Sequence, residues 1–111
     1  MSYKEKSIAL AKKLARSKGK CDKCGTTTGK MQGSHIMSVR FAATAALLAN
    51  IMCLCDRCHT GYPDSWHESP DANWKWFEAK WPGKRESLVK LSQGICRYRE
   101  SDCKDIYYHL N

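Results

Sequence analysis

Apolar residues recur at helical spacing near the start of the chain. Within residues 3–17, Ile8, Ala11 and Leu14 fall on one side of a helix, and lysine and arginine occupy much of the rest. We therefore expect a basic amphipathic helix that ends before Gly19, since glycine is common just after a helix. Its cationic face could be merely solvated or could contact phosphate groups.

The middle of the chain predicts short elements. Residues 30–39 are bounded like a short strand, and His35 is expected on that strand or just after it. The alanine- and leucine-rich run 40–50 favours a helix or a compact helical turn. Residues 51–54 are short, apolar and strand-like. The predicted order is therefore strand, helical turn, strand.

Aromatic residues mark a helix in the last third. A loop over residues 63–69 leads into a helix that begins around Pro70, because proline suits the first helical turn. Trp74, Phe77 and Trp81 follow at positions i, i+3 and i+7. This spacing is more typical of a core-facing stripe than of a base-stacking platform, so we interpret it as core.

The chain length allows one domain. Pro82 and Gly83 should end the aromatic helix, and further helices are expected at 86–91 and 101–110. A chain of 111 residues buries a modest fraction of its surface, so an additional stabilising cross-link is expected. We divide the single domain 1–111 into a basic N-terminal helix (1–20), a core (21–81) and a helical C-terminal extension (82–111).

The composition is strongly basic. Nineteen lysine and arginine residues against eleven aspartate and glutamate residues give a net charge of +8, which favours a nucleic-acid partner, although small domains can be basic for solubility alone. No apolar run approaches the roughly 20 residues needed to span a bilayer. We expect a soluble protein of a reducing, intracellular compartment without a membrane partner.

Four of the seven cysteines form two Cys-x-x-Cys pairs about thirty residues apart, a spacing typical of a zinc site. The expected ligands of this structural Zn²⁺ are Cys21, Cys24, Cys55 and Cys58. A disulfide scaffold is the alternative, but the odd count and the paired spacing disfavour it. Cys53 could replace Cys55, although the spacing favours Cys55. We expect Cys53 to be a buried strand thiol and Cys96 and Cys103 to be free.

The enclosed segment contains a histidine and an asparagine at informative positions. The run Cys21-x-x-Cys24, Gln32-Gly-Ser-His35-Ile, Asn50-Ile-Met-Cys-Leu-Cys55-x-x-Cys58-His59 resembles the zinc-containing HNH endonucleases of phages and prophages, over roughly residues 21–81. The resemblance implies a small α+β fold: a ββα-metal core stapled by the four-cysteine zinc site, with flanking N- and C-terminal helices. It also implies a phosphodiester hydrolase located in the cytoplasm of a bacterial host.

The resemblance also implies a role for each matched residue. His35 would be the general base, because a neutral imidazole can take a proton from water near neutral pH. His59, placed at the start of a helix, would bind a catalytic divalent ion such as Mg²⁺ or Mn²⁺. Asn50 would keep the base and the ion in register by bridging backbone groups. Two metal sites are thus expected, one closed and one open.

One position departs from the family pattern. Many HNH enzymes have an acidic residue or a histidine directly before the general base as a second metal ligand, and this chain has Ser34. His67 is the best replacement, followed by Asp64, Glu68 and Asn73. The ion could instead be held mainly by His59, substrate phosphate and water, or activity could be lost.

Simpler interpretations exist for the same residues. His35 could be an ordinary half-buried strand histidine, and His59 a fifth zinc ligand or a helix-start histidine. Asn50 could cap the helical segment before it. His109 is expected in the last turn of a helix, where it would interact with the helix dipole.

DNA, including branched DNA, is the expected partner, and a homodimer would suit a junction-resolving enzyme. Packaging and recombination are the processes that the resemblance suggests. Backbone contacts are expected from the first helix and from later cations: Lys12, Lys13, Arg16, Lys18, Lys20, Arg40, Lys75, Lys80, Lys84 and Arg85. The competing hypothesis is a non-catalytic zinc ribbon that binds nucleic acid or protein.

Overall fold

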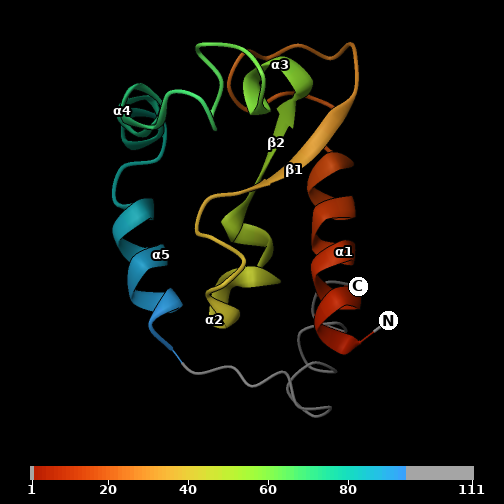
Figure 1. Ribbon diagram of the computed structural model, residues 1–111, viewed down its shortest axis with the longest axis vertical. Coiled ribbons are helices and arrows are strands. Elements are labelled where there is room, and N and C mark those ends of the chain that lie inside the picture. The colour runs from red at the N-terminus through yellow and green to blue at the C-terminus, as the bar shows by residue number, and fades with distance from the viewer. Residues whose placement is uncertain (1, 95–111) are drawn as a thin grey trace.

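A computed structural model of the protein describes residues 2–94. The chain runs in the following order (Figure 1): α1 (Tyr3–Arg16), β1 (Met31–His35), α2 (Ala42–Ala45), the 3₁₀ helix η1 (Leu48–Asn50), β2 (Ile51–Cys55), α3 (Asp56–His59), α4 (Pro70–Lys80) and α5 (Lys84–Ser92). The helix expected at 101–110, with Cys96, Cys103 and His109, lies outside the described residues.

Helix α1 is the predicted basic helix. Its N-terminus is capped by Ser2, whose side chain accepts a hydrogen bond from the Glu5 N–H at 3.2 Å. The helix ends at Arg16, and Gly19 follows in a left-handed conformation with φ of 67°. Ala11 and Ala15 are fully buried, so α1 packs through small side chains and comes close to its neighbours.

The two strands pair antiparallel, and their connection contains α2 and η1. Met31 lies opposite Cys55 and His35 lies opposite Ile51. Figure 1 shows the strands between α1 on one side and α4 and α5 on the other. A Cβ atom on Gly33 would come within 3.0 Å of the Lys12 Cα, so only glycine lets α1 lie this close to β1. This contact brings the cationic face of α1 beside the strand that carries His35.

The hydrophobic core combines the inner strand with the aromatic helix. All five residues of β2 are buried, and Met52 and Leu54 join Phe77 and Leu88 in one cluster. The Phe77 ring is fully buried, and half-buried Trp74 and Trp81 pack around it, as their spacing predicts. The fold is therefore a small α+β domain. No described helix is both long enough and apolar enough to cross a bilayer.

Candidate metal centres and catalytic side chains

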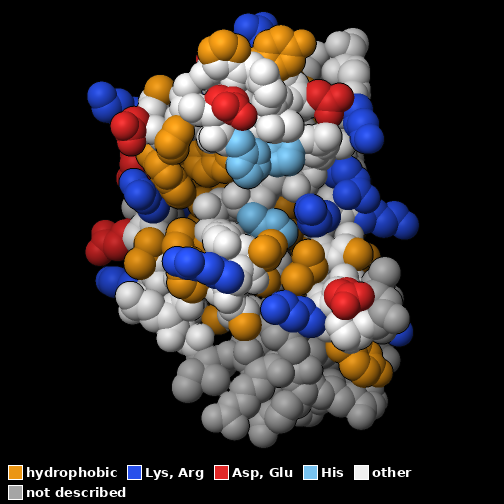
Figure 2. Space-filling view, in the orientation of Figure 1, with side chains coloured by type: hydrophobic (Ala, Val, Ile, Leu, Met, Phe, Trp, Pro, Cys, Tyr) orange, Lys and Arg blue, Asp and Glu red, His pale blue; other side chains and the backbone are white. Residues whose placement is uncertain are grey.

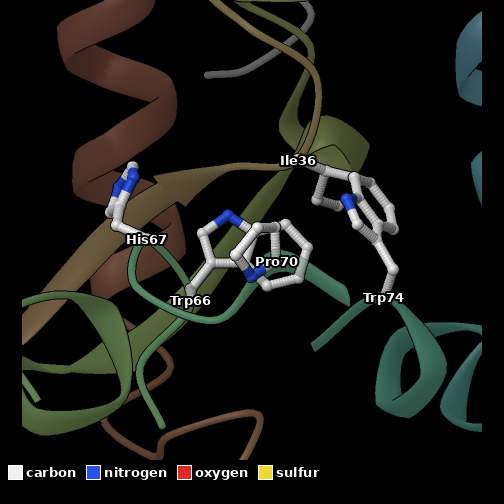
Figure 3. A pocket seen from close by; sticks show the side chains of 5 residues that line it. All are labelled: Ile36, Trp66, His67, Pro70 and Trp74. Atoms are coloured by element: carbon white, nitrogen blue, oxygen red, sulfur yellow. The ribbon is translucent and has the colours of Figure 1, made fainter. Parts of the chain in front are cut away.

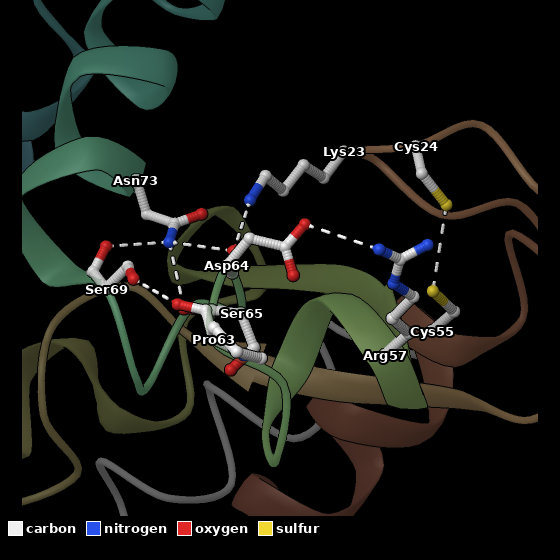
Figure 4. Close-up of polar contacts among 9 residues, drawn as sticks. All are labelled: Lys23, Cys24, Cys55, Arg57, Pro63, Asp64, Ser65, Ser69 and Asn73. Atoms are coloured by element: carbon white, nitrogen blue, oxygen red, sulfur yellow. Dashed lines mark hydrogen bonds and ion pairs between the residues drawn. The ribbon is translucent and has the colours of Figure 1, made fainter.

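The two Cys-x-x-Cys pairs converge on one point. The Sγ atoms of Cys21, Cys24, Cys55 and Cys58 all lie within 4.8 Å of one another. The dashed line in Figure 4 joins the Sγ atoms of Cys24 and Cys55, which are 3.7 Å apart. A tetrahedral ion with Zn–S bonds of about 2.3 Å needs Sγ atoms about 3.8 Å apart. The four thiols therefore fit a closed metal site such as that of structural zinc.

Crowding of the thiols changes their acidity. Burial raises the pKa of Cys21, but hydrogen bonds from the backbone N–H groups of Cys24, Cys55 and Lys23 outweigh it and bring this pKa to about 7. Burial, followed by hydrogen bonding among the thiols, raises the pKa of Cys58 well above its usual range. Since a bound cation would ionise all four thiols, this arrangement is suited to metal binding.

The remaining cysteine of β2 has a different role. Cys53 is fully buried and lies outside the four-thiol group, as predicted. Its backbone N–H donates to the Asp22 carboxylate at 2.8 Å, and its carbonyl accepts from the Asp22 N–H at 2.7 Å. Asp22 thereby fastens the first Cys-x-x-Cys segment to β2. We call residues 21–24 the first knuckle and residues 55–58 the second. Sequence reasoning missed Asp22, because no sequence pattern predicts that a residue between two zinc ligands will bond to the backbone of a distant strand.

Asn50 bridges the two ends of the connection between the strands. Its Oδ1 accepts from the Met37 N–H at 2.7 Å, and its Nδ2 donates to the carbonyl oxygens of Met37 at 3.1 Å and Thr44 at 3.0 Å. The side chain is fully buried, so it holds the segment after His35 against the start of β2.

We expect Asn50→Asp to lower the free energy of unfolding by roughly 2–5 kcal/mol, because a buried carboxylate keeps the acceptor but faces two carbonyl oxygens without a proton to donate. Chemical denaturation would measure the loss. The exposed amide Gln93 provides the control, since Gln93→Glu should change stability little. Equal stability of the Asn50→Asp protein and the wild type would refute the bridging role.

His35 ends β1 and has its protonation pattern set by the backbone. Its Nε2 lies 2.7 Å from the Ala45 carbonyl oxygen, which can only accept, so the neutral ring carries its proton on Nε2 and leaves Nδ1 free to take one. Burial lowers the pKa of His35, the Ala45 carbonyl raises it and the charge of Lys12 lowers it. The ring is therefore prepared to act as a base.

His59 is the last residue of α3, which corrects our expectation that it begins a helix. The helix starts directly at Asp56 because β2 runs straight into the second knuckle. The ring Nδ1 of His59 bonds to Gln32 Oε1, and its Nε2 faces the Nε2 of His67 at 3.1 Å. Sequence reasoning missed Gln32, because the family pattern places the second ligand directly before His35.

Ser34 provides no metal ligand of its own in this arrangement. It is buried, with 1% exposure, and its hydroxyl has no hydrogen-bond partner. Gln32 shares its face of β1, because side chains alternate along a strand, and Gln32 is the residue that reaches His59. The position directly before His35 is thus occupied by a small buried side chain.

The loop that carries His67 is fixed at several points. The His67 N–H donates to the His59 carbonyl at 3.2 Å, and Lys23 Nζ, from the first knuckle, donates to the Asp64 carbonyl at 2.8 Å. Figure 4 shows Asn73 Nδ2 directed at the same loop, where it donates to the carbonyls of Ser65 and Ser69 at 2.9 and 2.7 Å. Asn73 therefore positions the loop through its Nδ2, while its Oδ1, the atom that could bind a metal, is buried without a hydrogen-bond partner.

The other two alternatives for a second ligand also lie apart from the pair. Asp64 is exposed and forms an ion pair with Arg57 at 3.6 Å, and Glu68 is exposed. Within residues 2–94, the four cysteines are the one group of three or more His, Cys, Asp or Glu side chains arranged to hold an ion. His59 and His67 therefore form a pair of neighbouring imidazole rings with no third His, Cys, Asp or Glu arranged beside them in this part of the chain.

A cationic pocket opens beside this pair. It has a volume of about 620 Å³, and its lining includes Lys12 and Arg16 of α1, Lys30, Gln32 and His59. Figure 2 shows histidine side chains on one face of the molecule with lysine and arginine beside them. Burial lowers the pKa of both His35 and His59, and the charge of Lys12 lowers both further. For His59, burial and His67 contribute more.

The remaining expected phosphate contacts are dispersed. Lys18 forms an ion pair with Asp22 at 3.4 Å, and Lys84 has its pKa lowered by burial and then by Lys18. Arg40 lies over Phe41, and Arg85 lies over Trp74 with its Cζ 3.9 Å from the ring centroid. Four more of the expected cations are exposed outside the pocket lining: Lys13, Lys20, Lys75 and Lys80.

Comparison of the chain with protein-family models, curated proteins and solved structures finds no match. The assignment of function therefore rests on the residues themselves. They establish a small α+β domain in which a four-cysteine cluster able to bind a metal such as zinc adjoins a histidine pair and a cationic pocket.

Proposed function

We propose that the protein is a metal-dependent HNH endonuclease that hydrolyses DNA phosphodiester bonds in phage or prophage DNA processing. The observation that carries the proposal is the set of His35, Asn50 and His59 around one antiparallel strand pair. His35 ends β1, Asn50 precedes β2, and His59 follows β2 by one helical turn. A zinc ribbon that only binds has no chemical need for the two histidines.

The histidine pair fits a divalent ion. Two nitrogen ligands with bonds of about 2.1 Å to one ion lie about 3.0–3.4 Å apart at octahedral or tetrahedral angles, and the two Nε2 atoms are separated by 3.1 Å. Gln32 accepts the Nδ1 proton of His59, so the Nε2 lone pair of that ring is available. Mg²⁺ or Mn²⁺ bound there would polarise the scissile phosphate and stabilise the departing 3′ oxygen.

The chain's own groups account for the remaining steps. Lys12 and Arg16 would hold the DNA backbone in the cationic pocket through phosphate contacts. Nδ1 of His35 would take one proton from the attacking water as its oxygen bonds to phosphorus. The bond from phosphorus to the 3′ oxygen would then break and that oxygen would take a proton from solvent water, leaving a 5′ phosphate on one fragment and a 3′ hydroxyl on the other.

Zinc would have a purely structural role in this scheme. Lys23 and Asp22, which both lie inside the first knuckle, hold the His67 loop and β2 respectively. The four-cysteine site would thus keep the two halves of the catalytic site in register without taking part in the chemistry.

Cleavage of end-labelled duplex and four-way-junction DNA tests the proposal, with Mg²⁺, Mn²⁺ and other divalent ions supplied in turn to the zinc-loaded protein. We expect cuts that leave 5′ phosphates and that require an added ion. Absence of cleavage with every ion would favour the non-catalytic zinc ribbon.

His67→Ala should raise the Mn²⁺ concentration for half-maximal cleavage at least about tenfold, since it removes one of two protein ligands of the ion. A titration of cleavage rate against Mn²⁺ measures this shift. Glu78→Ala, an exposed change on α4, is the matched control and should leave the curve in place. Superimposable curves for His67→Ala and wild type would remove His67 from the metal site.

A further inference from the structure

A second pocket lies on the other side of the histidine pair. It has a volume of about 230 Å³ and is lined by Ile36, Trp66, His67, Pro70 and Trp74. Figure 3 shows His67 at one end of this group and Ile36 with Trp74 at the other. Ile36 and Trp66 are buried and form the floor, while His67 and Pro70 are exposed at the rim. The pocket is therefore open to a ligand from solvent.

The walls of this pocket are aromatic and rigid. The rings of Trp66 and Trp74 meet edge to face with centroids 5.0 Å apart, and Trp74 also packs on Phe77 at 5.2 Å. Arg85 places its guanidinium over Trp74, with Cζ 3.9 Å from the ring centroid. A site with tryptophan rings in its walls and a cation at its border is complementary to a flat ring that is joined to a phosphate.

The position of the pocket relates it to the proposed chemistry. His67 lines this aromatic pocket, His59 lines the cationic pocket, and their Nε2 atoms are 3.1 Å apart. Ile36 directly follows His35 in the chain. A DNA strand with its backbone in the cationic pocket would thus bring the base beside the scissile phosphate to the aromatic pocket.

We propose that the aromatic pocket binds one unpaired nucleobase next to the cleavage position, so that the protein prefers DNA in which a base is already unstacked. This inference rests on the proposed nuclease function and specifies its substrate class. In fully paired duplex the base must first be extruded at an energetic cost, which a bulge or a junction avoids. Because contact with the rings of Trp66 and Trp74 uses the flat face that every base has, we expect little discrimination among bases.

Fluorescence anisotropy with three labelled duplexes tests the inference, without any added divalent ion so that no cutting occurs. One duplex is fully paired, one has a single unpaired thymidine, and one has an abasic residue at the same bulge. We expect the unpaired thymidine to bind about five- to tenfold more tightly than the abasic bulge, which has the same bend and charge but no ring to stack. Equal affinity of the two bulged duplexes, or no binding of any of the three, overturns the inference.

Two variants locate the effect. Trp74→Ala should bring the preference for the unpaired thymidine to within about twofold of none. Trp76→Ala, a half-buried tryptophan of the same helix outside the pocket, should preserve it. Circular dichroism and zinc content verify that each variant is folded, and the wild-type comparison decides the matter without either variant.

The outcomes separate this inference from the nuclease proposal. Cleavage with equal binding of the two bulges would leave the nuclease intact and remove the base pocket. Selective binding of the unpaired thymidine without cleavage by any ion would preserve the pocket and remove the catalytic function.

Discussion

Cys55→Ser should yield a protein that holds no zinc and does not fold. Structural zinc sites contribute apparent binding free energies of about 10–16 kcal/mol, and a small domain has a net stability of only about 5–15 kcal/mol. Losing one of four thiolates would therefore remove most or all of the stability. The two Cys-x-x-Cys segments also anchor the loop of His67 and the backbone of β2, so the loss would extend beyond the zinc site.

Cys53→Ser is the matched control, because Cys53 lies two residues earlier on the same strand, is also buried and is outside the thiol cluster. Metal analysis and circular dichroism should find about one zinc per chain and native structure in this control. Prolonged chelation of the wild type should unfold it as Cys55→Ser does. A metal-free wild-type protein with an unchanged spectrum would contradict the structural role of the site.

His35→Ala should slow cleavage about 10²- to 10⁴-fold at saturating DNA, the usual contribution of a positioned general base. The loss should appear in kcat rather than in KM, because His35 would act on water and not on the DNA backbone. Val39→Ala, an exposed change four residues later, should leave the rate unchanged. If His35→Ala cuts as fast as the wild type, another group is the base.

The pKa of His35 also predicts a pH profile. Burial and Lys12 lower this pKa below the ordinary 6.5, against the opposing effect of the Ala45 carbonyl. Only the neutral ring can accept a proton, so kcat should be maintained as the pH falls to 6.5 and should decline below it. Stability has the same sign: below pH 6.5 the unfolded chain binds the proton more readily, which favours unfolding.

Lys12→Gln tests the electrostatic part of that profile. Removing the positive charge should raise the pKa of His35 and move the acidic limb of kcat toward higher pH, by a small amount because Lys12 is the weakest of the three influences. A limb that moves toward lower pH would mean that another group titrates.

Much of the fold could be predicted from the sequence, because the relevant signals are local. Alanine and leucine spacing predicted α1, proline placed the start of α4, and the apolar run at 51–54 predicted β2. The aromatic spacing correctly placed Phe77 in the core. The paired spacing of the cysteines was sufficient to predict that they would meet.

The parts that could not be predicted depend on contacts between distant segments. Gln32 meets His59 across 27 positions, and Lys23 reaches Asp64 across 41. Asn73 resembled a metal ligand by residue type, but its amide nitrogen donates to loop carbonyls and its Oδ1 is buried. The end of α3 at His59 was misplaced because a four-residue helix leaves almost no periodic signal.

Nicking of supercoiled plasmid by the zinc-loaded protein, with and without Mg²⁺ or Mn²⁺, is the decisive test of nuclease activity at His35. Wild type and His35→Ala are purified identically and matched in zinc content and circular dichroism. We expect ion-dependent nicking by the wild type and at least about a hundredfold slower nicking by His35→Ala. Failure of the wild type with both ions, or equal rates for the two proteins, would contradict it.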